Sequence, residues 1–220
     1  MRDSVKEFVD KEIWPNKDRF EKKDYALTEE TMRKAGEMGF LSIAVPEAYG
    51  GMGMGFVDTC LVCDYISGAT GSFSTAFGAH TGIGTMPITL YGTEEQKQKY
   101  LKPLASGEKI GAFCLSEPEA GSDATSQHTT AEDKGDHYLL NGTKNWITNG
   151  STASVYLVIA QTDYSKGHKG INAFIVEKNT PGITVGVKEN KMGIRGSDTH
   201  AISFTDVKVP KENRIGDEGF

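Results

Sequence analysis

Cysteine and positive charge are both scarce in this sequence. Its 220 residues include only three cysteines, an odd and low number that argues against a disulfide framework and for a reducing compartment. The 24 Lys and Arg are outnumbered by 30 Asp and Glu, which gives a net charge of -6. Because no basic cluster offsets this balance, the chain has no field to attract a polyanion, and we expect no nucleic-acid partner.

Long apolar runs are missing as well. The longest, 155–160, is far shorter than the roughly 20 residues that cross a bilayer. The N-terminal segment 1–13 carries several acidic residues and no continuous apolar region, unlike a transit or signal peptide. We therefore expect a soluble protein without a membrane partner, located in the cytoplasm of a bacterium or, in a eukaryote, in the mitochondrial matrix.

No metal site is expected. Cys60 and Cys63 form a Cys-x-x-Cys pair, but they lie in an apolar, helix-like run without a second pair of ligands. We expect buried structural thiols there, with a redox or zinc role as the alternative. The five histidines are scattered, and none stands at metal-ligand spacing from another.

The first half of the chain has helical periodicity. Thr28 is a candidate N-cap followed by two glutamates, and Thr93 and Gln96 stand in capping-box relation. Pro15 is expected to end or kink the first helix. The stretch 74–88 is small and apolar almost all round, which predicts a buried helix with space beside it. Helices are expected over 4–14, 28–38, 57–69, 74–88 and 93–105.

The second half changes to a period of two. The run 137–148 reads as two strands joined by Asn141-Gly142, the preferred pair for a two-residue hairpin turn. Further strands are expected over 154–161, 171–177, 182–187 and 200–209. The predicted class is α+β: an all-α helical domain over 1–111, followed by an antiparallel β-barrel domain over 112–220.

An acidic elbow, "CLSEPEAGSDA" at 114–124, follows the first strand of this second half. Glu117-Pro118 forces the strand to turn, and Ala120, Gly121 and Ser122 are small enough for a ligand to approach their N–H groups. Such donors, with the serine hydroxyl, can cradle a pyrophosphate. A solvated loop is the alternative.

The second candidate feature is "NWIT" at 145–148. On a strand, Trp146 and Thr148 point to the same face, so a broad aromatic surface lies two residues from a hydroxyl. A flat heteroaromatic ring can pack on the indole while the threonine bonds its edge. A tryptophan of the β core is the alternative.

Together these stretches resemble the acyl-CoA dehydrogenase family. The run 113–123 looks like the first signature of that family, and Trp146-Ile147-Thr148 looks like its second flavin contact. The similarity covers essentially the whole chain, because further matching stretches occur in both halves: 45–54, 91–108, 141–150 and 191–220.

The resemblance implies FAD as the cofactor and assigns contacts to the elbow. Phe113, Leu115 and Ser116 would border the flavin ring. Gly121 and Ser122 would lie near the FAD pyrophosphate, with Ser122 also near the thioester end of the substrate. Glu117 and Asp123 are interpreted as carboxylates that shape the turn.

The resemblance also implies roles for the second stretch and for the small-residue helix. Trp146 would shield the flavin, Thr148 would bond near its N5, and Ile147 lies between them. Gly78, Gly82 and Gly84 would leave room beside an acyl cavity. In the "KMGIRGSDT" run, 191–199, we expect Arg195 to pair with Asp198, with a contact to a charged ligand group as the alternative, and the run favours a short- or medium-chain substrate.

The reaction implied is α,β-dehydrogenation of an acyl-CoA thioester to a trans-2-enoyl-CoA. Electron-transferring flavoprotein would accept the electrons, and the full-length protein would be a homotetramer. The family has a second helical domain that supplies the glutamate base, so we expect the base beyond Phe220, no catalytic residue in this chain, and a fragment that is inactive alone. The alternatives are an acyl-CoA oxidase, a decarboxylating acyl-CoA dehydrogenase, and a non-catalytic binding module of the same fold.

Overall fold

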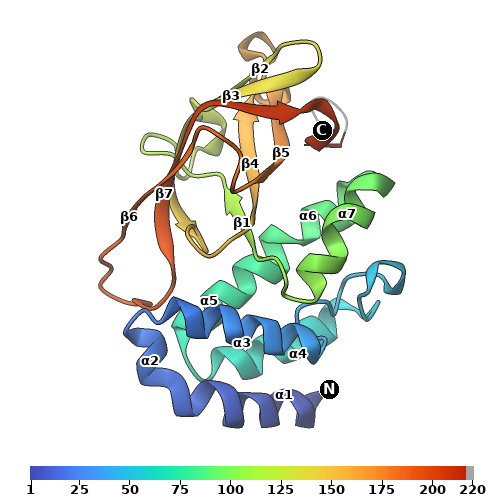
Figure 1. Cartoon of the computed structure of the whole chain (residues 1–220), viewed down its shortest axis with the longest axis vertical. Coiled ribbons are helices and arrows are strands. Elements are labelled where there is room, and N and C mark those ends of the chain that lie inside the picture. Colours follow the sequence, from blue (N-terminus) through green and yellow to red (C-terminus); the bar gives the residue numbers. More distant parts are fainter. Residues whose placement is uncertain (217–220) are drawn as a thin grey trace.

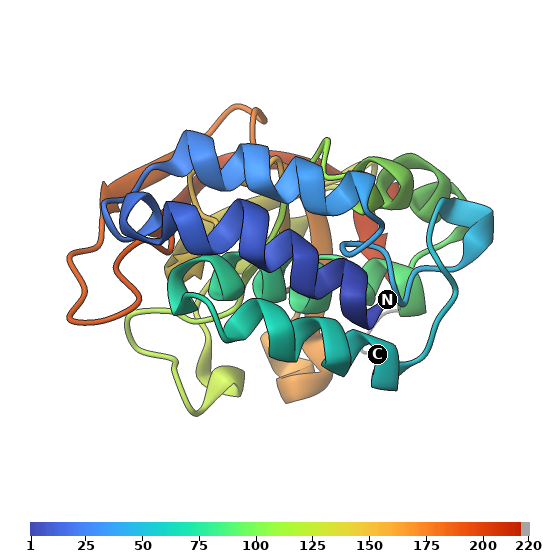
Figure 2. The same cartoon turned by 90° about the horizontal axis from the view of Figure 1, so that it is seen from below.

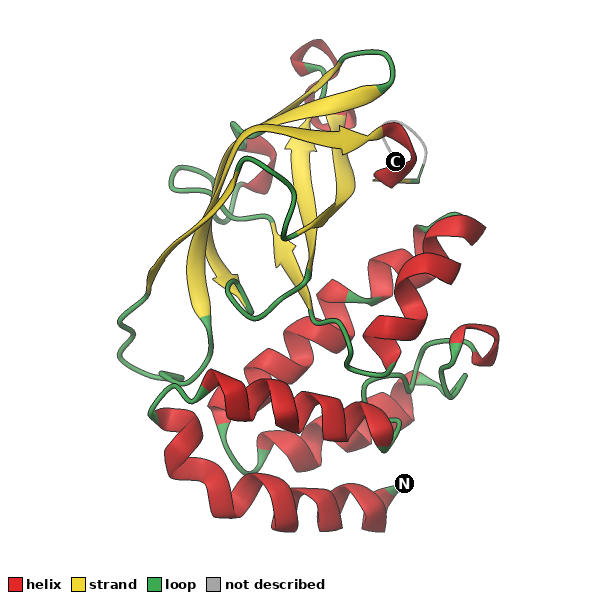
Figure 3. Ribbon diagram, viewed as in Figure 1, coloured by secondary structure: helices red, strands yellow, loops and turns green. Residues whose placement is uncertain are grey.

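Helices occupy one end of the molecule and strands the other, as the computed structural model shows (Figure 1; Figure 3). The structure describes residues 1–216, so the end of the family-like stretch 191–220 lies outside the described residues. The α-helices are α1 Arg2–Phe8, α2 Lys17–Glu21, α3 Tyr25–Glu37, α4 Phe56–Ser67, α5 Gly71–Gly78, α6 Met86–Tyr91 and α7 Glu94–Ala105. Seen from the helical end, they form a layer across one end of the sheet (Figure 2). The predicted α+β class is confirmed.

Two of these helices continue through π-helical turns. The segment Val9–Ile13 extends α1 to a 3-10 turn at Trp14–Asn16, so Pro15 marks the predicted kink. The segment Ala79–Gly84 joins α5 to α6, and the helix predicted over 74–88 is therefore one helical path with a π-helical turn at its centre.

The N-cap of helix α3 lies four residues before the predicted one. Asp24 is the cap, since its Oδ1 accepts a hydrogen bond of 3.1 Å from Leu27 N. Thr28 lies buried inside the helix, where its hydroxyl donates to the Asp24 carbonyl at 3.3 Å. The prediction of Thr28 was wrong because an aspartate one turn earlier offers the stronger acceptor. The capping box of Thr93 and Gln96 on α7 is confirmed.

The cysteine prediction was also wrong. Helix α4 buries Val62 and Ile66, which lie four residues apart on one face. Cys60 lies on the opposite side and is exposed, whereas Cys63 is partly buried. Among residues 1–216, no group of three or more His, Cys, Asp and Glu side chains is arranged to hold a metal ion. No helix in this range is long and apolar enough to cross a membrane.

The strands form one mixed sheet, not a purely antiparallel barrel. They are β1 Gly111–Cys114, β2 Thr130–Asp133, β3 His137–Thr148, β4 Val155–Gln161, β5 Ile171–Glu177, β6 Ile183–Lys188, β7 Thr199–Pro210 and β8 Arg214–Ile215. The order is β6-β7-β3-β2-β4-β5-β8, with β1 paired to β4. The pairs β1–β4 and β2–β4 are parallel. In each pair a long connection returns the chain to the end of the sheet where the earlier strand began, so that both strands run in the same direction.

Strand β3 runs unbroken through the predicted hairpin turn. Leu140 and Gly142 flank a β-bulge against β7, and Gly142 has a φ of +147°. A Cβ added there would lie 2.4 Å from the Thr129 hydroxyl. Glycine is therefore required at position 142 because Thr129 packs closely against its backbone, and not because the chain turns there. The hairpin instead joins β2 to β3 near Gly135, where Lys134 N donates to His137 O at 2.9 Å.

Helices and sheet meet where the π-helical turn crosses β1. A Cβ on Gly84 would lie 2.9 Å from the carbonyl carbon of Gly111, so these two glycines let the backbones touch. The fully buried His80 bridges the same joint. Its Nδ1 accepts from Gly111 N at 3.0 Å, and its Nε2 lies 3.0 Å from Leu104 O, so Nε2 carries the proton.

Candidate functional site

The acidic elbow closes on itself directly after β1. Glu117 N donates to Ala120 O at 3.0 Å, and Ala120 N donates back to Glu117 O at 3.3 Å. The Ala120 N–H is therefore not available to a ligand, which corrects the expectation for this residue. Gly121 and Ser122 are exposed, and a Cβ on Gly121 would meet no atom within 4 Å. Among residues 1–216, no acceptor is assigned to either N–H.

The elbow and the Trp146 stretch lie side by side, although about 30 residues separate them in sequence. Asn145 N donates to Ser116 O at 2.7 Å, and Lys144 Nζ donates to Leu115 O at 3.0 Å. The structure thus brings together two features that the sequence analysis selected independently.

A second β-bulge gives Trp146 its orientation. The register of β3 against β7 shifts between Lys144 and Ile147, and Trp146 within this shift has a φ of +61°. Its side chain is 61% exposed, whereas Ile147 is 2% exposed and belongs to the core. Thr148 is partly exposed. Trp146 is therefore not a core tryptophan, and one buried residue, Ile147, separates it from the partly exposed Thr148.

A buried ion pair, the Lys144–Glu117 pair, supports the elbow from below. The Nζ and Oε1 atoms are 2.7 Å apart, and the side chains are 0% and 4% exposed. Glu117 also accepts from the backbone N–H groups of His128 at 2.6 Å and Thr129 at 3.0 Å. Burial alone would raise the pKa of Glu117, but Lys144 and these N–H donors together hold that pKa below its ordinary value.

This geometry confirms that Glu117 shapes the turn, and Asp123 does so as well. The Asp123 carboxylate accepts from the hydroxyls of Ser126 and Thr125, the latter at 2.6 Å. These bonds lower the pKa of Asp123. Lys144 was missed by the sequence analysis. The sequence does contain a signal for it. Lys144 is an even number of residues from the core residues Tyr138 and Leu140, so on a strand its side chain is expected to point to the same buried face.

The end of β3 is fastened to the helical half. Asn149, with a φ of +61°, donates from Nδ2 to Ala76 O at 3.0 Å and to Gly111 O at 3.3 Å. Because Thr148 immediately precedes this residue, its position depends on α5 and β1 as well as on the sheet.

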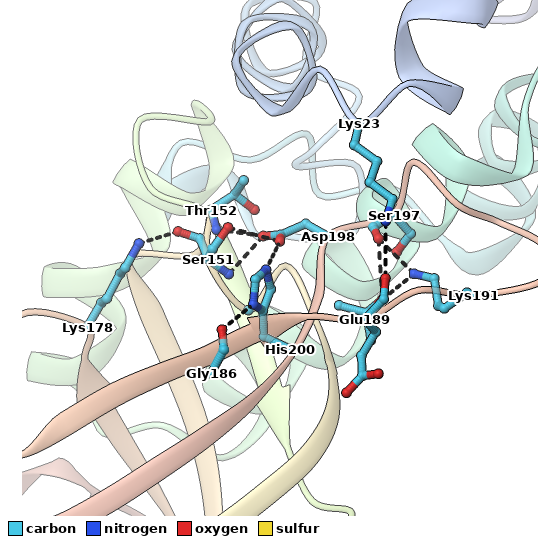
Figure 4. Close-up of polar contacts among 12 residues, drawn as sticks. Lys23, Ser151, Thr152, Lys178, Gly186, Glu189, Lys191, Ser197, Asp198 and His200 are labelled. Carbon is cyan, nitrogen blue, oxygen red and sulfur yellow. Dashed lines mark hydrogen bonds and ion pairs between the residues drawn. The ribbon is translucent and has the colours of Figure 1, made fainter.

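A second polar cluster, around Asp198, holds the turn at Ser151 and Thr152 that follows β3 (Figure 4). The Asp198 carboxylate accepts from Ser151 N at 2.8 Å and Thr152 N at 2.7 Å, and it lies 2.7 Å from Nε2 of His200. The His200 ring also contacts Gly186 O on β6 at 2.8 Å. The predicted pairing of Arg195 with Asp198 was wrong, because the buried carboxylate is used by these nearer donors.

An apolar cavity of about 170 Å³ lies beside the small-residue helix. Gly78 and Gly82 line it, and a Cβ on either would meet no atom within 4 Å, so both glycines leave room as predicted. Gly84 does not line this cavity. It packs against β1, which corrects the expectation for that residue.

A helical half joined to a mixed sheet defines an α+β protein, and its candidate site is the elbow after β1 together with the Trp146 bulge of β3 that is bonded to it. The family model "Acyl-CoA dehydrogenase, N-terminal domain" matches residues 1–108, and "Acyl-CoA dehydrogenase, middle domain" matches residues 112–207. The chain belongs to the acyl-CoA dehydrogenase family.

Known proteins of this family are similar over the whole chain. An acyl-CoA dehydrogenase of Bacillus subtilis is 47% identical over 100% of this chain and 58% of the relative. A short-chain specific acyl-CoA dehydrogenase of Clostridium acetobutylicum is 42% identical over the same shares. The crystal structure of a Bacillus anthracis acyl-CoA dehydrogenase complexed with FAD superposes with a TM-score of 0.93 at 42% identity, covering 99% of this chain and 37% of that one. The chain thus spans about half the length of these relatives, or less.

Proposed function

We propose that this chain provides the cofactor-binding half of an FAD-dependent acyl-CoA dehydrogenase that converts an acyl-CoA to its trans-2-enoyl-CoA. The observation that carries the proposal is the contact between the elbow and the Trp146 bulge, through Asn145 N and Ser116 O at 2.7 Å. This contact joins the strand that carries the exposed Trp146 to the elbow that carries the exposed Gly121 and Ser122, and a flavin with its pyrophosphate would need an aromatic surface and backbone donors on such joined segments.

The residues present fit FAD, whose flavin supplies hydride-accepting chemistry when bound. Trp146 offers an exposed aromatic face for stacking, and Thr148 offers a hydroxyl for a ring edge. Ile147 is buried, so its contribution would come from the backbone alone. The remaining proposed contacts lie at the end of β1 and on the elbow. Three are at the flavin and two at the pyrophosphate: Phe113, Leu115, Ser116, Gly121 and Ser122.

We place the catalytic base outside this chain. Glu117 is buried and bonded to Lys144, and Asp123 is bonded to two hydroxyls of its own turn. Glu119 is exposed, and its carboxylate lies 3.5 Å from the ring of His128. A proton α to a thioester must be removed by a base held within hydrogen-bond reach, and none of these three carboxylates is arranged for that role.

The remaining assignments are proposals for the whole protein. We propose residues 1–111 as a helical domain and 112–220 as the middle domain. We propose a short- or medium-chain acyl-CoA as the substrate, electron-transferring flavoprotein as the electron acceptor, a homotetramer as the assembly, and a bacterial cytoplasmic or mitochondrial matrix location.

A visible absorption spectrum tests this function. Purified chain should develop a bound-flavin spectrum on addition of FAD, and butyryl-CoA should not bleach it, because the base is missing. Absence of any FAD binding, in this chain and in a version extended to the length of its relatives, would refute the proposal. Bleaching of the short chain by butyryl-CoA would refute the placement of the base.

A further inference from the structure

The Lys144–Glu117 pair is a buried ion pair that the proposed chemistry leaves unused. Lys144 Nζ has three N–H donors, and all three have partners: Leu115 O at 3.0 Å, Glu117 Oε1 at 2.7 Å and Gln127 Oε1 at 3.0 Å. Burying two charges costs free energy that their attraction does not always offset. Such a pair therefore suggests a geometric role.

The directions of these bonds indicate what that role is. One donor of Lys144 fixes the Leu115 carbonyl, and the next residue, Asn145, fixes the Ser116 carbonyl. The bulge begins at the same point, so Trp146 must adopt a φ of +61°, a conformation that costs a non-glycine residue free energy. Such a conformation persists only where the surroundings leave no alternative, and the buried Lys144 lies two residues earlier, where the register shift begins.

We propose that the Lys144–Glu117 pair positions the cofactor site: it sets the register of the β3 bulge and thereby holds the Trp146 indole against the elbow. Both members are positioning residues and touch neither cofactor nor substrate. The consequence for FAD rests on the proposed function, whereas the effect on Trp146 does not.

Trp146 itself reports the effect. In a Trp14→Phe parent it is the only tryptophan, so its steady-state fluorescence anisotropy measures how firmly the bulge holds it. Lys144→Met should lower this anisotropy without FAD present. It should also weaken FAD binding by about tenfold to a hundredfold, by analogy with the loss of residues that hold metal ligands in place.

Two further variants separate positioning from stability. Val209→Ala removes buried atoms at the far end of the same strand pair, opposite Tyr138, and should lower the melting temperature while leaving the anisotropy and the FAD affinity unchanged. Lys144→Met combined with Glu117→Gln leaves no unpaired charge, so stability should largely return while the anisotropy and affinity stay low.

The results distinguish this proposal from the proposed function. If the double variant regains the parent's anisotropy, or if Val209→Ala lowers it as much as Lys144→Met does, the pair only stabilises the fold and the positioning role is refuted. If the anisotropy falls as expected but neither the parent nor its version extended to the length of the relatives binds FAD, the positioning role stands and the proposed function fails.

Discussion

Acidification should destabilise the chain through His80. Burial lowers the pKa of His80 to about 4, from an ordinary value of 6.5, because the fully buried ring cannot be solvated as a cation. Its Nδ1 also already accepts the Gly111 N–H, so protonation would break that bond. The folded chain therefore binds this proton less tightly than the unfolded chain does.

The sign and size follow from linkage. Where the unfolded state binds more protons, stability rises with pH. The contribution of His80 is complete above about pH 6.5 and is lost as the pH falls toward 4. With these two pKa values, the step from pH 7 to pH 5 removes about 2 kcal/mol of unfolding free energy. Urea unfolding followed by circular dichroism at both pH values measures this loss.

His80→Gln provides the control. Glutamine stays uncharged at both pH values, so the loss between pH 7 and pH 5 should be about 2 kcal/mol smaller in the variant than in the parent. All other titrating groups are common to both proteins and cancel in the comparison. Equal losses in the two proteins would refute the account of a buried, neutral His80.

Three further outcomes are expected from local geometry. Gly84→Ala should cost about 1–3 kcal/mol by thermal unfolding, because its Cβ would lie 2.9 Å from the β1 backbone. Gly82→Ala should be neutral or stabilising by up to about 1 kcal/mol, because a Cβ on Gly82 would meet no atom within 4 Å. Equal losses of stability in the Gly84 and Gly82 variants would contradict the close approach of Gly84 to β1. A thiol reagent should modify the exposed Cys60 at once, and the buried Cys114 only on unfolding; fast labelling of both would be inconsistent with the fold. Thr93→Ala should cost about 1 kcal/mol through loss of the α7 cap, and no change in melting temperature would show that the cap contributes nothing.

Local signals predicted the parts of the fold that depend on neighbouring residues. The capping box of α7 lies within four residues and was correct. The Asn141-Gly142 pair is an equally local signal, yet it predicted a turn where β3 continues. The backbone is extended at this point because β3 pairs with β7, about 60 residues away, and because Thr129 packs against Gly142. No pattern confined to the strand contains that information.

The candidate site was predicted in pieces and not as an assembly. The elbow and the Trp146 stretch were each selected from residue types, but either one alone had a structural alternative. Lys144 was overlooked because lysine is almost never fully buried. Its partner Glu117 lies 27 residues earlier, so the pair becomes visible only when the elbow folds onto β3.

The proposed cofactor site depends on the joint between the helical and strand-rich halves. Asn149 ties the end of β3 to a carbonyl of α5 and to Gly111, and His80 ties Gly111 to the end of α7. Because β1 runs from this joint into the elbow, contacts with the helical half help to fix where the elbow and the end of β3 lie. The two halves therefore need each other for the geometry of the site, although all the proposed FAD contacts lie on the strand-rich half.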